Sequence, residues 1–319
     1  MIDPFLRRIH YLRISITDKC NLRCTYCLPE GTTFFPEETL LSYDEIIRIS
    51  SVMADLGIDA IRLTGGEPLA RKDCVELVGE LKKMKNIKKV NLTTNGVFLP
   101  KYIEKLAEYK LDGLNISLDT LDQELFKTIT GRDKFKEVID GINLAIEHNI
   151  DVKINCVLVK GVNESEIIPI ANLARDLPVA VRFIELMPVE SCMQLEGIDS
   201  DEVLDILSEE YGFLESDSVQ RGFGPAKYLK SAKLKGSIGF IDPMTHNFCA
   251  KCNKLRLTSD GFLKLCLYHD DGISLRDILR AGASDEVLKN EILNSVAKKP
   301  EKHNFNEKPN FETMSKIGG

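Results

Sequence analysis

Three cysteines near the start of the chain, Cys20, Cys24 and Cys27, are separated by three and then two residues, and Tyr26 directly precedes the last of them. Thiolates grouped this tightly are typical metal ligands, and a structural zinc site or an ordinary four-iron cluster takes four protein ligands. Three cysteines leave one metal position open to a small molecule. The spacing therefore favours an iron–sulfur cluster with an exposed iron, with a zinc site completed by a distant fourth ligand as the alternative.

A pair of glycines follows one strand–helix unit later, in the sequence Thr64-Gly65-Gly66-Glu67-Pro68. Glycine lets the backbone approach a bound molecule closely, and proline stiffens the exit from the turn. By itself such a pair is more typical of a plain turn. Because ligands bind at the carboxyl ends of parallel strands, we expect this pair and the cysteine loop to occupy the same rim.

Further residues able to contact a ligand stand at the ends of later predicted strands. Thr93 ends one of them, Ser117 lies near the end of another, and Met187 follows a third. A Ser or Thr at such a position usually serves only as a cap. Their recurrence at successive strand ends favours a ligand shared by the whole rim.

A second cysteine group lies near the C-terminus, at Cys249, Cys252 and Cys266. Here a zinc site is a stronger alternative, because His246 or His269 could complete a Cys3His set. Beside the first group, a second iron–sulfur cluster is the favoured interpretation. A free iron in that cluster could bind a nitrogen or oxygen of the substrate.

Several basic side chains lie in or near the predicted strands. Most Arg and Lys residues form solvated salt bridges, but burying a charge without a partner is costly. Arg13 and Arg182 lie within apolar segments, and this position indicates a polar or anionic ligand. The basic candidates on or near these strands are Arg13, Arg62, Lys153 and Arg182.

Strand-like and helix-like segments alternate from about residue 11 to residue 185, which predicts a parallel sheet covered by helices. The periodicity fits an open doubly wound sheet and a partial barrel equally well. Six short segments rich in Val, Ile and Leu are the predicted strands: Leu12–Thr17, Ala60–Thr64, Lys89–Thr93, Gly113–Leu118, Val152–Val159 and Val179–Ile184.

Helix boundaries are marked by capping residues. Ser42 and Glu45 form a capping-box pattern for a helix that Gly57 stops, and Asn163 with Glu166 predicts a similar start. Apolar residues recur at the helical period over Lys134–His148. Further on, the predicted helices are Asp201–Tyr211, Leu275–Ala281 and Ser284–Ala297, and the polar segment Lys298–Asn310 is predicted to be an exposed loop.

Composition limits the functions that the chain can have. Its net charge of −7 argues against a general nucleic-acid binder. No apolar run has the length of a membrane span, and the first residues do not form a secretory signal, so we expect a cytoplasmic protein without a membrane partner. Nine cysteines in tight groups argue against a disulfide framework. Cys74, Cys156 and Cys192 stand alone and are predicted to be buried structural thiols.

The combination of Cys20-x3-Cys24-x2-Cys27, Tyr26 and Gly65-Gly66-Glu67-Pro68 resembles the radical S-adenosylmethionine superfamily. The resemblance implies that the three thiolates hold a [4Fe-4S] cluster whose open iron is chelated by S-adenosylmethionine. An electron from that cluster would give methionine and a 5′-deoxyadenosyl radical, which takes hydrogen from a substrate. The resemblance further implies that S-adenosylmethionine contacts Tyr26, Gly65, Gly66, Glu67, Ser117 and Met187.

The second cysteine group, Lys254-Leu255-Arg256 and the terminal Gly318-Gly319 make the chain similar to the GTP 3′,8-cyclase family of molybdenum cofactor biosynthesis. This similarity implies a partial (βα)6 TIM-type barrel over residues 1–190 and a C-terminal iron–sulfur and GTP-binding region over residues 191–319. It implies a lyase with two [4Fe-4S] clusters, in which C3′ of GTP loses hydrogen and is joined to C8. No catalytic residue is expected beyond the clusters and the cofactor.

The same similarity implies the substrate contacts and the partners. GTP would contact Arg13, Arg62, Thr93, Lys153, Arg182, Lys254, Leu255, Arg256, Gly318 and Gly319. Many members have Arg-x-Arg after the second cysteine, whereas Lys254 here keeps the charge but loses the planar fork of arginine. The implied partners are GTP, an electron donor that the sequence does not identify and, downstream, cyclic pyranopterin monophosphate synthase, with a homodimer as one candidate assembly.

Two other functions stay open. One is a different two-cluster radical enzyme, such as a peptide maturase, although those enzymes usually have more C-terminal cysteines than the three here. The other is a non-catalytic protein that binds about two zinc ions, one at each cysteine group.

Overall fold

Six parallel strands form the centre of the structure, and a helix follows each of them. The computed structural model describes residues 1–28, 31–188, 192, 194–219, 221–303 and 314–317. The strands are β1 (Tyr11–Ser15), β2 (Ala60–Thr64), β3 (Lys89–Thr94), β4 (Gly113–Ser117), β5 (Val152–Val157) and β6 (Ala180–Ile184). Each overlaps its predicted segment, because strands buried on both faces need apolar side chains at most positions.

The helices between these strands are α1 (Tyr43–Asp55), α2 (Cys74–Lys83), α3 (Leu99–Glu108), α4 (Gln123–Thr130), α5 (Phe135–Glu147) and α6 (Ile167–Asp176). The capping box predicted at the start of α1 is confirmed. The Ser42 hydroxyl accepts a hydrogen bond from the Glu45 amide at 3.1 Å, and the Glu45 carboxylate accepts one from the Ser42 amide at 2.7 Å. Gly57 follows the helix with a φ of +98°, a conformation that favours glycine.

The capping box predicted at Asn163 and Glu166 is wrong. A short 3-10 turn, η3 (Glu164–Glu166), precedes α6, and the Asn163 side chain does not cap it. The Asn163 amide group instead accepts a hydrogen bond from the Val159 amide at 2.8 Å and donates one to the Asp119 carbonyl at 2.9 Å. Tertiary partners therefore compete successfully for a side chain whose local sequence is typical of a cap.

The C-terminal half contains the three predicted helices, α7 (Ser200–Tyr211), α8 (Leu275–Arg280) and α9 (Asp285–Val296), and the short α10 (Met314–Ile317). Its strands are β7 (Glu215–Ser216), β8 (Lys227–Lys230), β9 (Ser237–Ile241), β10 (Lys254–Leu257), β11 (Phe262–Lys264) and β12 (Gly272–Ser274). The predicted exposed loop at Lys298–Asn310 is wrong at Lys299, which is 3% exposed; residues 304–310 lie outside the described part of the chain.

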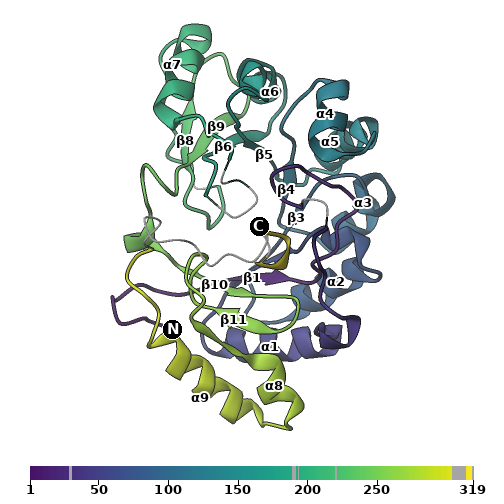
Figure 1. Cartoon of the computed structure of the whole chain (residues 1–319), viewed down its shortest axis with the longest axis vertical. Helices are drawn as coiled ribbons and strands as arrows, with labels where there is room; N and C mark the ends of the chain where they lie inside the picture. The colour runs from purple at the N-terminus through teal and green to yellow at the C-terminus, as the bar shows by residue number, and fades with distance from the viewer. Residues whose placement is uncertain (29–30, 189–191, 193, 220, 304–313, 318–319) are drawn as a thin grey trace.

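All these strands belong to one sheet, in the order β12-β11-β10-β1-β2-β3-β4-β5-β6-β9-β8-β7. The C-terminal half contributes to both sides of it, since β10 pairs in parallel with β1 and β9 pairs in parallel with β6. Figure 1 shows the central strands curving around an inner space, with α1 to α7 outside. The arrangement is an α/β partial barrel whose terminal strands β12 and β7 do not pair within the described residues.

The alternation of side chains along each strand separates a core from an inner face. Leu12, Ile14, Ile61 and Leu63 are fully buried in the hydrophobic core. Residues between them, such as Arg13, lie on the opposite face of the sheet, which places charged side chains inside the barrel. None of the helices found in the described ranges is both long and apolar enough to cross a membrane.

Candidate functional site

The first cysteine group lies in the loop after β1, and its three members line one cavity. This cavity encloses about 1140 Å³ of space that opens to solvent. The other predicted cofactor contacts except Glu67 line it as well, namely Tyr26, Gly65, Gly66, Ser117 and Met187. A cavity lined by three thiols, a glycine pair and a few polar side chains is typical of a site for a small molecule.

Tyr26 fixes the cysteine loop to the ends of two strands. Its hydroxyl donates a hydrogen bond to the Asp119 carboxylate at 2.5 Å, and the other oxygen of Asp119 accepts one from the Val157 amide at 2.8 Å. Burial raises the pKa of Asp119 to about 6, although the bond from Tyr26 acts in the opposite direction. The loop that contains Cys24 and Cys27 is therefore tied to the carboxyl ends of β4 and β5.

The glycine pair packs against the backbone that leads into the same loop. A Cβ atom on Gly65 would lie 2.4 Å from the Thr17 carbonyl oxygen, and one on Gly66 would lie 2.4 Å from the Lys19 carbonyl oxygen. The Gly66 amide also donates a hydrogen bond to the Thr17 carbonyl at 2.7 Å. Both residues line the cavity, but this close approach to the cysteine loop already requires glycine.

Glu67 does not line the cavity. Its fully buried carboxylate accepts hydrogen bonds from the Leu69 amide at 2.9 Å, the Thr94 hydroxyl at 2.8 Å and the Asn95 amide at 2.7 Å. The Asn95 side chain in turn donates to the Cys20 sulfur at 3.7 Å. The structure therefore places Glu67 behind the cysteine loop, where it orients Asn95.

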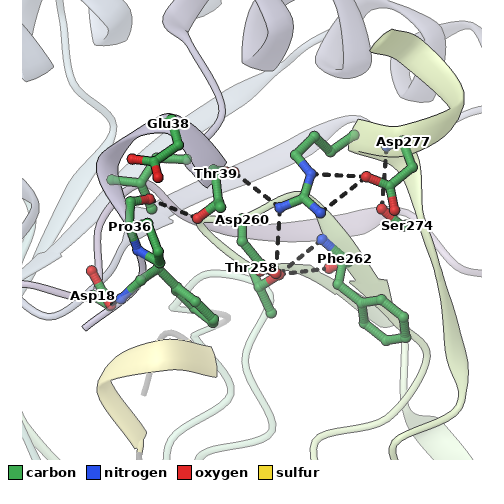
Figure 2. Close-up of polar contacts among 12 residues, drawn as sticks. Asp18, Pro36, Glu38, Thr39, Thr258, Asp260, Phe262, Ser274 and Asp277 are labelled. Atoms are coloured by element: carbon green, nitrogen blue, oxygen red, sulfur yellow. Dashed lines mark hydrogen bonds and ion pairs between the residues drawn. The ribbon is translucent and has the colours of Figure 1, made fainter. Parts of the chain in front are cut away.

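The segment after this loop is held by the C-terminal part of the chain (Figure 2). The Phe35 amide donates a hydrogen bond at 2.5 Å to the carboxylate of Asp18, which lies two residues before Cys20. The Thr39 carbonyl accepts one at 3.2 Å from Arg276 in α8. The two halves of the chain thus meet at the segment that follows the first cysteine loop.

The chemistry of the three thiols fits an iron–sulfur cluster. Burial and the negative charge of a neighbouring Cys20 thiolate raise the pKa of Cys27 to about 12. Burial, with Cys27 next, raises the pKa of Cys24 well above its ordinary value. Three thiolates can exist together here only if a positive charge compensates them, and bound iron ions supply such a charge.

The second cysteine group lines an adjoining cavity of about 1210 Å³, also open to solvent. Thr93, Asn155, Ile184 and Met187 line both cavities, so the two cysteine groups face neighbouring parts of one inner space. Six of the predicted substrate contacts meet in the second cavity: Arg13, Arg62, Thr93, Arg182, Lys254 and Arg256.

The register of the sheet explains why these residues meet. Arg13 is paired with Arg62 on β2 and with Arg256 on β10, so three arginines occupy one row across the strands. Asn155 is paired with Arg182 in the same way, and the Asn155 side-chain oxygen accepts a hydrogen bond from it at 2.5 Å. A row of like charges is unfavourable unless an anion compensates it.

The electrostatics of this cavity favour an anionic ligand. Burial, followed by the charge of Arg256, lowers the pKa of Arg13 to about 9. Burial also lowers the pKa of Lys254 to about 7. The Nε of Arg182 is buried without a hydrogen-bond partner in the described part of the structure. A phosphate group could stabilise these charges and bind the remaining donors.

Tyr11 belongs to this cavity but was missed at the sequence level. Its hydroxyl accepts a hydrogen bond from the Arg62 Nε, and the Nη1 of Arg62 donates to the Thr93 hydroxyl at 3.3 Å. Burial raises the pKa of Tyr11, but the charges of Arg62 and Arg13 outweigh that effect and lower it overall. Asn115, Asn155 and His303 were missed as well; the signal for the two asparagines is a polar residue inside an apolar strand.

Some predicted substrate contacts are not in the cavity. Lys153 is buried and forms an ion pair with Asp151, and Leu255 is 1% exposed in the hydrophobic core. Gly318 and Gly319 lie outside the described residues. As predicted, the isolated Cys74, Cys156 and Cys192 are buried; Cys192 also lines the first cavity.

The histidines proposed for a zinc site have other partners. His246 is 3.6 Å from the Asp242 carboxylate, and the His269 Nε2 is 3.2 Å from the Lys302 carbonyl. His303 lines the second cavity, but its Nε2 is 3.1 Å from the Pro243 carbonyl. Within the described ranges, no three His, Cys, Asp or Glu side chains lie close enough to hold a single metal ion.

Cationic groups lie near Cys252, one member of the second cysteine group. Burial raises the pKa of Cys252, but the charge of Lys299, the Lys254 amide and the charge of Lys254 outweigh it, so that the pKa is lowered overall. The Lys254 ammonium also lies 4.8 Å from the centre of the Phe248 ring. A thiolate stabilised in this way is a good ligand for iron.

Comparison with known proteins finds a matching family for each half of the chain. Residues 14–174 match the family described as the radical SAM superfamily, and residues 179–305 match the one described as Molybdenum Cofactor Synthesis C. The chain is 43% identical over 323 residues to the GTP 3′,8-cyclase of Clostridium perfringens strain 13, with 100% of both chains covered. It is 41% identical to human molybdenum cofactor biosynthesis protein 1, covering 95% of this chain and 48% of the human one.

Among solved structures, the chain is similar to Streptococcus suis SuiB bound to S-adenosylmethionine. The TM-score is 0.65 at 17% sequence identity, and the alignment covers 94% of this chain and 74% of SuiB. At this identity the similarity concerns the fold alone, which is the open α/β barrel described above.

Proposed function

The chain belongs to the GTP 3′,8-cyclase family within the radical S-adenosylmethionine superfamily, and from this premise we propose that it converts GTP into its 3′,8-cyclised dihydro product. The observation that supports this most is the pair of adjoining cavities. One is lined by three cysteines and the glycine pair, and the other by three cysteines and a row of arginines. A cofactor and an anionic substrate could therefore lie side by side.

We assign the first cavity to a [4Fe-4S] cluster and S-adenosylmethionine. Cys20, Cys24 and Cys27 would hold the cluster, and the residues around the open metal position would bind the cofactor. The proposed cofactor contacts are Tyr26, Gly65, Gly66, Ser117 and Met187. When bound and reduced by an external electron donor, these groups would supply a 5′-deoxyadenosyl radical, with release of methionine, for the removal of hydrogen from C3′ of GTP. The chain's own task is to orient them and to exclude water.

We assign the second cavity to GTP and to a second [4Fe-4S] cluster held by Cys249, Cys252 and Cys266. Arg13, Arg62 and Arg182 would bind phosphate oxygens, because their guanidinium groups line this cavity together, and the hydrogen bonds described for Arg62 and Arg182 go to neutral side chains. Lys254 and Arg256 lie next to the cysteines, where they would contact the purine or the cluster. Glu67 would act through Asn95, whose amide donates a hydrogen bond to it, and we assign no direct contact with GTP to Lys153 or Leu255.

The wider assignment follows from the same proposal. The reaction is that of a lyase and needs an external electron donor. The unstable product would pass to cyclic pyranopterin monophosphate synthase. We further propose that residues 1–190 form the radical barrel and 191–319 the region for the second cluster and GTP, and that the protein works in the reducing cytoplasm, where clustered thiols persist. A homodimer is the assembly to test.

The test is an anaerobic assay with GTP, S-adenosylmethionine and a reductant, followed by mass analysis of the products. A 3′,8-cyclised product together with 5′-deoxyadenosine is expected. A peptide maturase would instead leave GTP unchanged and respond to a peptide, and a zinc protein would contain no sulfide after anaerobic purification. Neither alternative has a specific observation in its favour.

Cys24→Ala is the sharpest variant for this test. Two remaining thiolates should not hold the cluster in a form that binds S-adenosylmethionine, so the yield of 5′-deoxyadenosine should fall at least about a thousandfold. Cys74→Ala is the matched control, because Cys74 is buried in α2 and lines neither cavity. Retention of activity in Cys24→Ala would contradict the assignment of the first cavity.

A further inference from the structure

Lys299 is a buried lysine that the proposed reaction leaves without a role. It lies just after α9 and is 3% exposed. Its ammonium donates a hydrogen bond to the Lys254 carbonyl at 3.0 Å and another to the Leu265 carbonyl. Lys254 comes two residues after Cys252, and Leu265 directly precedes Cys266. One side chain thus joins the two segments that contribute these cysteines.

Arg7 supports the remaining segment from the other end of the chain. It donates a hydrogen bond to the Cys249 carbonyl at 2.9 Å and another to the Glu301 carbonyl at 2.6 Å. It also forms a buried ion pair with Asp3 at 2.5 Å, so a carboxylate balances its charge. The two hydrogen bonds that the described structure gives Lys299 both go to backbone carbonyls.

Burying an ammonium group is costly, and a well-packed apolar side chain would usually stabilise the fold as well or better. A positive charge is useful here because a thiolate-bound cluster is negatively charged and becomes more so on reduction. Net charge and hydrogen bonding near the sulfurs set the reduction potential of such clusters. The positive charge of Lys299 acts on the Cys252 thiol, whose pKa it lowers.

We propose that Lys299 is a positioning residue for the C-terminal iron–sulfur cluster: it holds the Cys252 and Cys266 segments together and raises the cluster's reduction potential. The inference rests on the proposed function, because it requires a cluster at the second cysteine group. Its two parts are separable, since one depends on the hydrogen bonds and the other on the charge.

The test uses the full chain with Cys20, Cys24 and Cys27 replaced by alanine, so that only the C-terminal cluster is observed. In this parent, Lys299→Met removes both the charge and the hydrogen bonds, whereas Lys299→Gln removes the charge and keeps a donor. Lys298→Met is the matched control, because its side chain is exposed. The measurements are a redox titration followed by electron paramagnetic resonance, and the rate of iron release to a chelator.

A more negative midpoint potential is expected in both Lys299 variants, and none in Lys298→Met. Iron release should be about tenfold faster in Lys299→Met, as is usual when the support of a metal ligand is lost, with Lys299→Gln closer to the parent. If Lys299→Met does not fold, Lys299→Gln alone still tests the potential.

An unchanged potential in Lys299→Gln would overturn the role of the charge. Equal iron release from Lys299→Met and Lys298→Met would overturn the role in positioning. A parent that binds no iron would refute the second cluster itself and this inference with it, and that result is visible before any Lys299 variant is made.

Discussion

At the scale of single residues, the cavity side chains are fixed by one another before any ligand arrives. Arg62 lies between an acceptor on each side, the Tyr11 hydroxyl and the Thr93 hydroxyl. Tyr26 is held in the same way by Asp119. An arginine that is oriented in advance loses less side-chain entropy when it binds a phosphate. The neighbours of the basic residues should therefore influence substrate affinity.

Tyr11→Phe tests this influence. The substitution removes the oxygen that accepts a hydrogen bond from Arg62 and leaves the ring in place, so the arginine is no longer held in one orientation. A hydrogen bond to a charged group contributes about 1.5–3 kcal/mol, and we expect the KM for GTP to rise about tenfold with little change in kcat. Steady-state kinetics under anaerobic conditions measure both constants.

Tyr211→Phe is the control for this prediction. Tyr211 is also buried and also makes one side-chain hydrogen bond, to Asn172 at 2.7 Å, but it belongs to α7 outside the barrel. The KM of the Tyr211→Phe variant for GTP should stay at the wild-type value. An equal increase in KM in the two variants would mean that the weaker GTP binding of Tyr11→Phe comes from general destabilisation.

At the scale of elements, the features that could be predicted from the sequence are those that depend on residues close together in the chain. The six central strands follow from short apolar runs, and the start of α1 follows from the reciprocal bonds of Ser42 and Glu45. The open choice between a doubly wound sheet and a partial barrel was decided by long-range pairing. The pairing of β10 with β1 and of β9 with β6 could not be predicted, because it joins segments more than 50 residues apart that have no shared local pattern.

The same distinction applies to the site. The cysteine groups and the arginines were found because their residue types are informative in any context. Tyr11 and Lys299 were not, since a tyrosine at the start of a strand and a lysine in a polar segment are ordinary features. Only the structure shows that their side chains are buried beside charged or metal-binding groups.

Asn163 illustrates how a loop side chain can hold two elements together. Its amide group, 1% exposed, bonds to the backbone of Val159, Asp119 and Val157. Asn163→Ala would leave these buried groups without a partner, and we expect the free energy of unfolding to fall by about 2–3 kcal/mol. Because Asp119 orients Tyr26, the cluster of the first cavity should also lose iron more readily.

Chemical denaturation of the anaerobically purified protein measures the first effect, and iron analysis measures the second. Asn290→Ala is the control, since Asn290 is an exposed residue of α9 and should change stability by less than about 0.5 kcal/mol. A stable Asn163→Ala protein with full iron content would show that water or neighbouring side chains replace the lost bonds.

At the scale of the whole molecule, the C-terminal half extends the partial barrel at both sides and lines its second cavity. It places β10 beside β1 and β9 beside β6, at the two sides of the six central strands. It also contacts the segment after the first cysteine loop, through Arg276 and Thr39. The match of the two halves to separate families therefore does not mean that each half folds alone.

A chain that ends at residue 190 tests this dependence. Its β1 and β6 would become edge strands with unpaired backbone groups and an apolar outer face, and such strands are prone to pair with other chains. We expect this fragment to be insoluble or to elute as aggregates in size-exclusion chromatography. A chain that ends at residue 303 keeps every strand of the sheet, and it should elute as a compact species with the circular dichroism of the full protein. A soluble, cooperatively unfolding 1–190 fragment would instead mean that the six-stranded barrel is an independent unit to which the second cavity is added.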